Sequence, residues 1–172
     1  RQITAETDLI DGQVQPASLD LRLGRRAWRV RASFLARKGQ SVADRLAEFA
    51  MHEIDLAPGA VLETGCVYVV ELMESLALPA DVHAAANAKS STGRLDLLTR
   101  LIADGTPEFD RVDAGYRGPL YAEISPLTFS VLVRPGARLN QIRFSKGAAQ
   151  LDDDALRALH GVDPLVNGEP LI

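Results

Sequence analysis

The stretch Pro16-Ala17-Ser18-Leu19-Asp20-Leu21-Arg22-Leu23-Gly24 alternates leucine with polar residues and stops at a glycine. Successive side chains of a β-strand point to opposite faces, so this alternation predicts a half-buried strand. Trp28-Arg29-Val30-Arg31 continues the alternation after a short turn. The chain therefore begins as a β protein whose strands are short and are separated by proline and glycine.

The same pattern recurs through most of the chain. It predicts further strands at Val61–Leu72, Val82–Ala86, Leu97–Ala103, Gly118–Ile124, Phe129–Val133 and Leu139–Phe144. Pro58-Gly59 and Pro135-Gly136 favour type II turns between strands. Helices are expected at only two places, Ser41–Ala50 and Asp152–His160, where serine or aspartate precedes a helical pattern. The fold class is all-β, a sandwich, jelly roll or barrel with short helices.

Composition narrows the possible functions. The 172 residues are 47% hydrophobic, enough to bury the core of one domain, and the net charge of −4 gives no general attraction for nucleic acid or an anionic membrane. Any phosphate site must therefore be local. No apolar run reaches membrane-spanning length, and we expect a cytoplasmic protein. The single cysteine, Cys66, stands in an apolar strand pattern, which predicts a buried structural thiol.

One carboxylate stands where a core residue is expected. Glu123 lies within the apolar, β-favouring run Leu120-Tyr121-Ala122-Glu123-Ile124. A charged side chain that points inward from a strand is costly to desolvate, so it is found there only when it is paired, protonated or used in chemistry. Taken alone, however, the alternation of strand side chains favours a solvent-facing Glu123. The neighbouring motifs bear on this choice.

The first of these motifs is Asn87-Ala88-Lys89-Ser90-Ser91-Thr92-Gly93-Arg94-Leu95, which begins where a strand is expected to end. If Ser90 opens a short helical turn, backbone N–H groups and the hydroxyls of Ser90 and Ser91 can point at one phosphate. Lys89 and Arg94 would add positive charge. A solvated polar turn explains the same composition equally well.

The second motif is Arg111-Val112-Asp113-Ala114-Gly115-Tyr116-Arg117-Gly118, in which charged and aromatic residues flank a glycine turn. Asp113 can accept a hydrogen bond from a sugar hydroxyl, and Tyr116 can pack against the face of the sugar. Arg111 can contact a phosphate or pair with Glu123. A surface turn in which Asp113 hydrogen-bonds to its own backbone is the structural alternative.

Four separated blocks together resemble the ordered motifs of the dCTP deaminase and dUTPase superfamily. They are Gln15 to Gly24, Lys89-Ser90-Ser91-Thr92-Gly93-Arg94-Leu95, Arg111 to Gly118, and Arg138-Leu139-Asn140-Gln141-Ile142. The resemblance runs from about Gln13 to Phe144. It implies a distorted jelly roll, or β-clip, of the dUTPase-like type, with active sites shared between the subunits of a homotrimer or a pseudo-hexameric assembly.

Within that superfamily the chain is most similar to the long deaminases of dCTP, in which two such domains are joined. On this interpretation the chain is the first half. Residues 1–150 would form the dUTPase-like β domain, and residues 151–172 a C-terminal helix and tail that link it to a second domain.

The resemblance implies hydrolytic deamination of dCTP to dUTP and ammonia, without a metal at the reacting carbon. Glu123 matches the general acid/base, while Ser90 and Arg94 match residues that position the water and the pyrimidine. The carbonyl of Ala103 aligns with a backbone acceptor for that water. Asp113 matches the contact to the 3'-hydroxyl. Four residues match contacts to the triphosphate: Lys89, Ser91, Arg111 and Gln141.

The resemblance also bears on cofactors and ligands. Mg²⁺ would arrive with the nucleotide triphosphate, and dTTP is a candidate regulator. Zinc deaminases need an H-x-E pattern with P-C-x-x-C, whereas this chain has one cysteine and an adjacent His52-Glu53 pair, so zinc is not expected. The chain departs from the family at Lys89, where arginine is usual, and at the insertion of residues 104–110.

Two alternatives remain open. A dUTP pyrophosphatase, alone or combined with deaminase activity, would use water held by Asp113, and the turn at Asp113 to Gly118 fits that family almost as well. Glu123 argues against a pure dUTPase. A non-catalytic, nucleotide-binding or structural half of a tandem protein is the other alternative, against which the joint presence of Glu123, Ser90 and Arg94 argues.

Overall fold

The structure is a computed structural model that describes residues 2–147, 151–164 and 166–168. The strands are β1 (Ile3–Ala5), β2 (Val14–Gln15), β3 (Ser18–Val30), β4 (Ala50–Asp55), β5 (Ala60–Leu62), β6 (Val67–Ala77), β7 (Val82–Ala88), β8 (Leu97–Ala103), β9 (Arg111–Val112), β10 (Arg117–Pro126), β11 (Val131–Val133) and β12 (Arg138–Lys146). The helices are α1 (Val42–Phe49), α2 (Ser90–Gly93) and α3 (Asp153–Val162). The predicted all-β class with short helices is confirmed.

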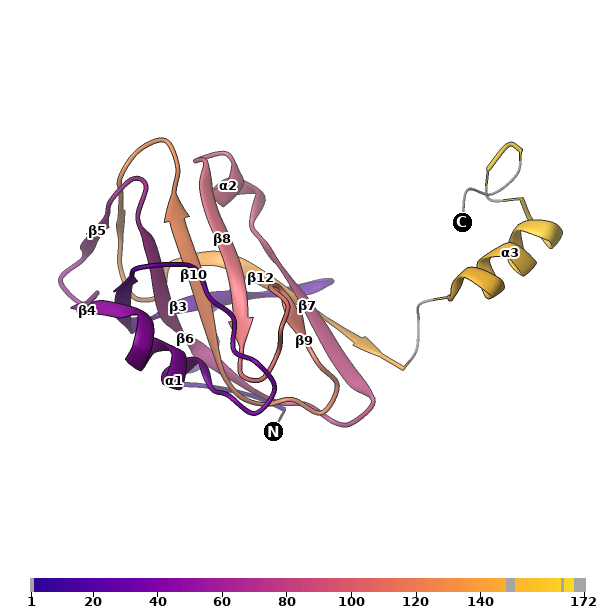
Figure 1. Cartoon of the computed structure of the whole chain (residues 1–172), viewed down its shortest axis with the longest axis horizontal. Coiled ribbons are helices and arrows are strands. Elements are labelled where there is room, and N and C mark those ends of the chain that lie inside the picture. Colours follow the sequence, from indigo (N-terminus) through magenta and orange to yellow (C-terminus); the bar gives the residue numbers. More distant parts are fainter. Residues whose placement is uncertain (1, 148–150, 165, 169–172) are drawn as a thin grey trace.

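Antiparallel pairing joins most strands into one sheet that folds over on itself (Figure 1). Its order is β8-β10-β6-β3-β12-β7-β9, and β1, β2 and β4 pair with β6 or β3 beside this path. β5 and β11 form a separate two-stranded sheet. The long strand β3 links the two halves, because it pairs with β6 on one side and with β12 on the other.

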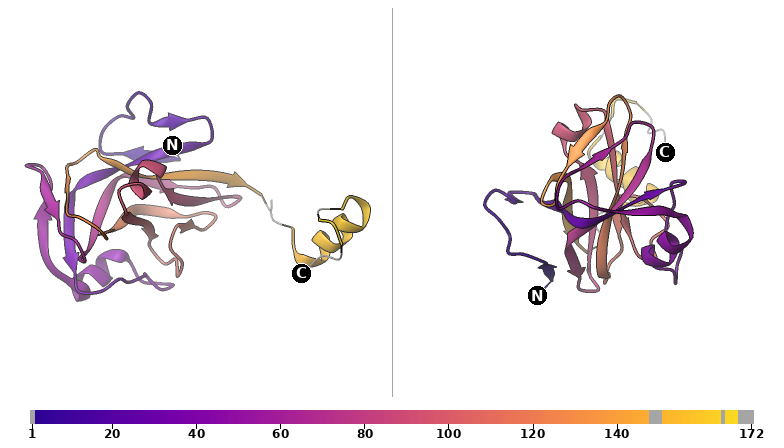
Figure 2. Two further views of the ribbon diagram at one scale, coloured as in Figure 1. Left: turned by 90° about the horizontal axis from the view of Figure 1, so that it is seen from above. Right: turned by 90° about the vertical axis from the view of Figure 1, so that its left-hand side faces the viewer.

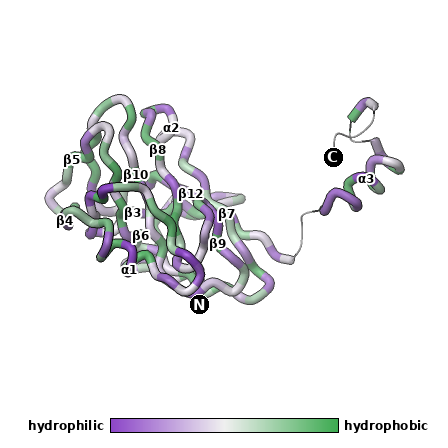
Figure 3. Tube along the Cα trace, in the orientation of Figure 1, coloured by the Kyte–Doolittle hydropathy of each residue, from purple (hydrophilic) through white to green (hydrophobic). Residues whose placement is uncertain are grey.

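β10 is covered on both of its faces. On one face, Leu120, Ala122 and Ile124 belong to the main core, which fills the space between the two halves of the sheet. On the other face, Tyr121 belongs to a second cluster that contains Trp28 and residues of α1. The apolar run along β8 and β10 lies between these two cores (Figure 3). Sequence alternation alone therefore underestimates how deeply β10 is buried.

Several boundaries differ from those expected. β3 is one continuous strand rather than two, and its register with β6 shifts between Leu23 and Ala27. Gly24 lies at this bend, and a Cβ there would be 2.7 Å from the carbonyl oxygen of Glu71. The glycine that we interpreted as the end of a strand instead permits two strands to approach closely.

Other expectations are corrected or confirmed in the same region. The predicted strand Val61–Leu72 is two strands, β5 and β6, and β4 was not predicted at all. Cys66 lies just before β6, is half-buried, and accepts a hydrogen bond from Nη2 of Arg29 at 2.9 Å, so the expectation of a buried thiol in a strand was wrong. Both Pro-Gly turns are present, with φ of +89° at Gly59 and +83° at Gly136.

The two longer helices begin as the sequence predicts. Ser41 and Asp44 form a capping box at α1: the Ser41 hydroxyl accepts from the Asp44 N–H, and the Asp44 carboxylate accepts from the Ser41 N–H. Asp152 caps α3, which has no buried residue and lies apart from the β strands in Figure 1 and in the left-hand view of Figure 2. Positions 165 and 169–172 of the expected tail lie outside the described residues. Within the described part of the chain, no helix combines the length and the apolar character needed to cross a membrane.

Candidate active site

Glu123 points inward from β10, as its position in an apolar run suggested. It is only 2% exposed and lies on the face of the sheet that carries the second cluster. In the register of the sheet it stands between Val69 of β6 and Arg100 of β8. The solvent-facing alternative is thereby excluded.

The partner of this carboxylate is Arg100. Nη2 of Arg100 donates to Oε1 of Glu123, and the same nitrogen lies 3.2 Å from the Ser33 hydroxyl. The guanidinium carbon is 3.7 Å from the centroid of the Phe109 ring, a cation–π contact. Oε2 of Glu123 has no hydrogen-bond partner among the described residues. The pair therefore uses one carboxylate oxygen and leaves the other buried without a partner in the described part of the chain.

The segment after β7 forms a short helical turn, which is one of the two possibilities that the sequence left open. α2 begins at Ser90 with Lys89 as its N-cap residue, and Ser90, Ser91 and Arg94 are exposed. The turn is fixed to β12, because the Thr92 hydroxyl donates to the carbonyl of Leu139 at 3.0 Å and the Lys89 N–H donates to the same carbonyl at 2.8 Å. α2 thus presents polar side chains from a rigid base.

Lys89, Ser90 and Gln141 line one groove, together with residues of β3 and of the turn before it. At its base Asp20 is 1% exposed, and its carboxylate pairs with Lys89 and, at 3.4 Å, with Arg138. The Oδ1 atom of Asp20 has no partner among the described residues. Two cations and one buried carboxylate leave the groove with a local positive balance, in a chain whose net charge is negative.

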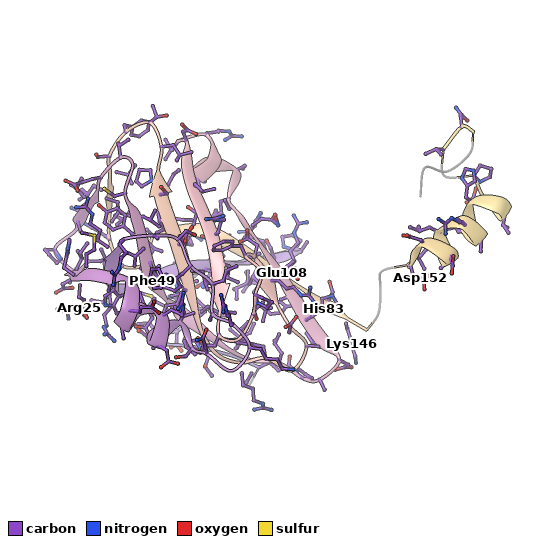
Figure 4. The ribbon with its side chains drawn as sticks, viewed as in Figure 1. Arg25, Phe49, His83, Glu108, Lys146 and Asp152 are labelled. Carbon is purple, nitrogen blue, oxygen red and sulfur yellow. The ribbon has the colours of Figure 1, made fainter. Side chains whose placement is uncertain are left out.

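Arg111 and Asp113 line a second hollow, near the start of β7, with Glu108 and His83 at its edge (Figure 4). Nε of Arg111 lies 2.9 Å from Oδ1 of Asp113, and Nη1 lies 2.9 Å from Glu108. Both hollows open on the same face of the sheet, because the register places Gln141 beside Asn87, and Arg111 beside Ala85, two residues along the same strand. Arg111 does not pair with Glu123; Arg100 does.

Tyr116 and Ala103 mainly stabilise the fold, through burial and through hydrogen bonds to neighbouring backbone groups. The Tyr116 hydroxyl donates to the carbonyl of Pro119 at 2.5 Å and accepts from the N–H of Asp104 at 3.2 Å. Burial of this ring raises the pKa of the phenol. Ala103 is fully buried at the end of β8, and its carbonyl accepts from the Thr106 N–H at 3.4 Å.

The insertion that precedes the second motif is ordered around one residue with a left-handed backbone. Asp110 has φ of +61°, its Oδ1 accepts from the N–H of Leu101 at 2.7 Å, and its carbonyl accepts from the N–H of Ala86. Burial raises the pKa of the Asp110 carboxyl above its ordinary value, opposed by the Leu101 hydrogen bond and by nearby Arg100. The loop holds Phe109 against Arg100.

The structure groups the predicted residues into separate places. Lys89, Ser90 and Gln141 share one groove, Arg111 and Asp113 share another hollow, and Glu123 lines neither of them. Among the described residues, no cluster of three or more His, Cys, Asp or Glu side chains is placed to hold a metal ion.

Sequence reasoning missed Arg100 and Asp20. Each is a charged residue inside an apolar strand pattern, which is the same signal that drew attention to Glu123. Arg100 interrupts Leu97–Ala103 as Glu123 interrupts the run in β10, so comparison of the two strands could have suggested the pair.

Comparison with known proteins places the chain among nucleotide deaminases. The family model for the 2'-deoxycytidine 5'-triphosphate deaminase (DCD) N-terminal domain matches residues 1–148. The crystal structure of 2'-deoxycytidine 5'-triphosphate deaminase from Agrobacterium tumefaciens is 57% identical, with a TM-score of 0.84, over 99% of this chain and 51% of that chain.

Two curated relatives agree with this match. The dCTP deaminase of Halorubrum lacusprofundi is 30% identical over 141 residues, which are 81% of this chain and 66% of the relative. The "dCTP deaminase, dUMP-forming" of Beutenbergia cavernae is 32% identical over 135 residues, which are 78% of this chain and 67% of the relative. The chain thus spans about two thirds of these relatives and about half of the Agrobacterium protein.

A more distant likeness bears on the fold alone. The dUTPase from EIAV has a TM-score of 0.50 and 10% identity over 88% of this chain and 92% of that chain. The expected dUTPase-like jelly roll is therefore confirmed. With the family model matching nearly the whole β body, this chain belongs to the family of 2'-deoxycytidine 5'-triphosphate deaminase N-terminal domains.

Proposed function

We propose that this chain contributes the catalytic residues of a deaminase that hydrolyses dCTP to dUTP and ammonia, a step in pyrimidine deoxynucleotide metabolism. The observation that carries the proposal is Glu123, a carboxylate that is 2% exposed, paired with Arg100 through one oxygen and unpartnered at the other. A carboxylate that is kept buried with a spare acceptor is suited to general acid/base work.

In the proposed reaction, Glu123 removes a proton from a water molecule as the water oxygen attacks C4 of the cytosine ring. Glu123 returns this proton to N3 of the ring, and it then transfers the remaining hydroxyl proton to the amino group, which departs as ammonia as the C4–N bond breaks. Ser90 and Arg94 position the water and the pyrimidine. The Ala103 carbonyl is proposed as a further acceptor for the water, in addition to its bond with the Thr106 N–H, since a carbonyl oxygen has two lone pairs.

The polar face of the sheet is proposed as the nucleotide-binding surface. Lys89, Ser91 and Gln141 would contact the triphosphate at the groove beside α2, and Arg111 would contact it from the second hollow. Asp113, beside Arg111, would accept a hydrogen bond from the 3'-hydroxyl, and Tyr116 would stand near the sugar. Mg²⁺ belongs to the substrate in this proposal and would arrive bound to the phosphates.

A shared active site would explain why Glu123 lies outside the groove that holds Lys89 and Ser90. We propose that a second subunit of a homotrimer, or of a pseudo-hexameric assembly, brings its α2 against Glu123. Residues 1–150 would be the deaminase domain and residues 151–172 the connection to a second domain, since the chain aligns with about half of the Agrobacterium protein.

A second candidate is a deaminase that also releases pyrophosphate and forms dUMP. The name of the Beutenbergia relative favours it, because that protein is described as dUMP-forming. Asp113 would be the residue that holds the hydrolytic water in that case. The two candidates differ in products and are separated by a single assay.

The test is the Glu123→Gln variant of the intact protein, supplied with dCTP and magnesium. Glutamine keeps the shape but cannot accept and return a proton, so ammonia release is expected to fall by at least about 10²-fold while nucleotide binding persists. Ammonia and pyrophosphate are measured separately, together with binding of dCTP by calorimetry.

Glu71→Gln is the matched control. Glu71 lies on the neighbouring strand β6 and is partly exposed, and its carboxylate forms a long ion pair of 3.9 Å with Arg26, so its loss should leave ammonia release unchanged. Ammonia release at the wild-type rate by Glu123→Gln would remove Glu123 from the mechanism. Pyrophosphate release by the wild-type protein would favour the dUMP-forming candidate.

A further inference from the structure

The Glu123 carboxylate is held through only one of its two oxygens. Oε1 accepts a hydrogen bond from Arg100, whereas Oε2 has no partner among the described residues. The register of β8 and β10 sets this contact, because the two residues stand directly opposite each other on one face of the sheet. The contact is therefore fixed by paired strands rather than by a loop.

The Arg100 guanidinium is itself held from two further sides. Its flat face stacks on the Phe109 ring at 3.7 Å, and its Nη2 lies 3.2 Å from the Ser33 hydroxyl. A guanidinium that is stacked on an aromatic ring loses much of its rotational freedom. The Arg100 side chain is 31% exposed against 2% for Glu123, so the cation lies on the solvent side of the pair.

A general base must be ionised before the reaction and must present a lone pair toward the water. At Glu123 the lone pairs of Oε2 meet no donor in the part of the chain that the structure describes. The pair is monodentate, since Nε of Arg100 is also without a partner among the described residues. Oε2 therefore remains free to exchange protons while Oε1 is held in place.

We propose that Arg100 is a positioning residue of the deamination, which holds Glu123 by Oε1 so that Oε2 alone carries protons between the water and the cytosine ring. The inference rests on the proposed function. As the C4–O bond forms and the C4–N bond breaks, Oε2 transfers one water proton to N3 and one to the departing amino group. Arg100 keeps its own protons throughout.

The test compares Arg100→Met and Arg100→Lys in the intact protein. Met removes the charge, so kcat for ammonia release should fall about 10²-fold, as expected when a catalytic group loses its alignment. KM should stay within about 2-fold, because Arg100 does not contact the substrate.

Lysine restores the charge and a hydrogen-bond donor but not the planar stacking on Phe109. Arg100→Lys should therefore recover only part of the lost kcat, because the ammonium group is not held by the ring. Arg25→Met is the matched control, because Arg25 forms an exposed ion pair with Asp55 at 2.8 Å. Its kcat and KM should equal those of the wild-type protein.

If circular dichroism shows that Arg100→Met is unfolded, the Phe109→Leu variant provides the test instead, because it loosens the guanidinium of Arg100 without removing its charge. A lower kcat at unchanged KM supports the proposal, and wild-type kcat overturns it. A folded Arg100→Met with wild-type kcat, or with a lower kcat that Arg100→Lys does not partly restore, also overturns it. If the wild-type protein releases ammonia and Glu123→Gln releases it as well, the proposed function is wrong, and this inference is wrong with it.

Discussion

Asp110 is a half-buried carboxylate on a left-handed backbone, within the loop that holds Phe109 against Arg100. Burial raises the pKa of this carboxyl. Because the folded state holds the proton more tightly than the unfolded state, the stabilising contribution is complete at acidic pH. It is lost as the pH rises through the raised pKa of the folded state. At neutral pH the fold therefore carries an ionised carboxylate in an unfavourable place.

Asp110→Asn should stabilise the protein at neutral pH. Asparagine tolerates a positive φ as well as aspartate does, and its amide oxygen can still accept from the Leu101 N–H. We expect the midpoint of thermal unfolding to rise by about 1–3 °C at pH 7 and the gain to disappear at acidic pH, where Asp110 is protonated.

Scanning calorimetry at several pH values measures this difference. Asp96→Asn controls for the backbone, since Asp96 also has a positive φ, of +52°, but is exposed. A gain that is equal at all pH values would show that the charge of Asp110 is not its source.

At the scale of single residues, the sequence identified candidate catalytic and binding residues better than it identified the residues that contact them. Glu123 and Lys89 could be singled out because a charge in an apolar run, or next to serines and glycine, is unusual. Arg100 could not be assigned to Glu123, because cross-strand neighbours depend on a register that is set by the whole sheet. An unusual residue type can be recognised from the sequence, whereas the pairing of side chains on neighbouring strands depends on the tertiary structure.

In the proposed nucleotide site, the element that matters most is α2, a single turn whose one buried residue is Thr92. So short a helix is not stable by itself and depends on its attachments. The Thr92 hydroxyl and the Lys89 N–H both donate to the carbonyl of Leu139 on β12. This shared acceptor sets the distance between the serines of α2 and the groove.

Thr92→Val should therefore weaken binding more than it weakens the fold. Valine has the same shape but lacks the donor, so the free energy of unfolding should fall by about 0.5–1.5 kcal/mol. KM for dCTP should rise several-fold, because the turn is less firmly held. Urea unfolding and steady-state kinetics measure the two effects.

Thr64→Val, which changes an exposed contact with Ser130, is the control and should leave KM unaltered. If KM of Thr92→Val equals that of the wild-type protein, α2 does not form the phosphate-binding turn.

Elements were predicted where local rules decide them. The capping box of α1, the Pro-Gly turns and the turn at Ser90 follow from contacts within a few residues, and all are present. The continuity of β3 and the existence of β4 were missed, because a glycine such as Gly24 can mark either a strand end or a close approach. Only the neighbouring strand distinguishes these two cases.

At the scale of the whole molecule, the separation of Glu123 from α2 is the main consequence of the topology. β8 begins just after α2 and carries Arg100. One chain thus contains every proposed residue, but Glu123 does not line the groove beside α2. A shared site requires that Glu123 of one subunit meets Ser90 of another.

Two inactive variants should then restore each other. Glu123→Gln and Ser90→Ala, each expected to be inactive, are unfolded together, refolded as a mixture and assayed for ammonia release. With random assembly, about one quarter of the sites would combine an intact Glu123 with an intact Ser90. We therefore expect roughly a quarter of the wild-type activity.

A mixture of the two folded variants without subunit exchange is the control and should stay inactive. No recovery after co-refolding, at a confirmed oligomeric state, would place the complete site within one subunit. Light scattering gives that state.

The buried Asp20 carboxylate has a consequence for which anions the protein accepts. Lys89 and Arg138 already have an internal counterion, so an empty groove does not need chloride or sulfate from the medium. An anion that enters the groove must compete with the Asp20 carboxylate for Lys89 and Arg138. A monovalent ion competes poorly at this close range, whereas a polyvalent phosphate chain competes well. We therefore expect the groove to select anions by their valence, independently of any contact to a base or a sugar.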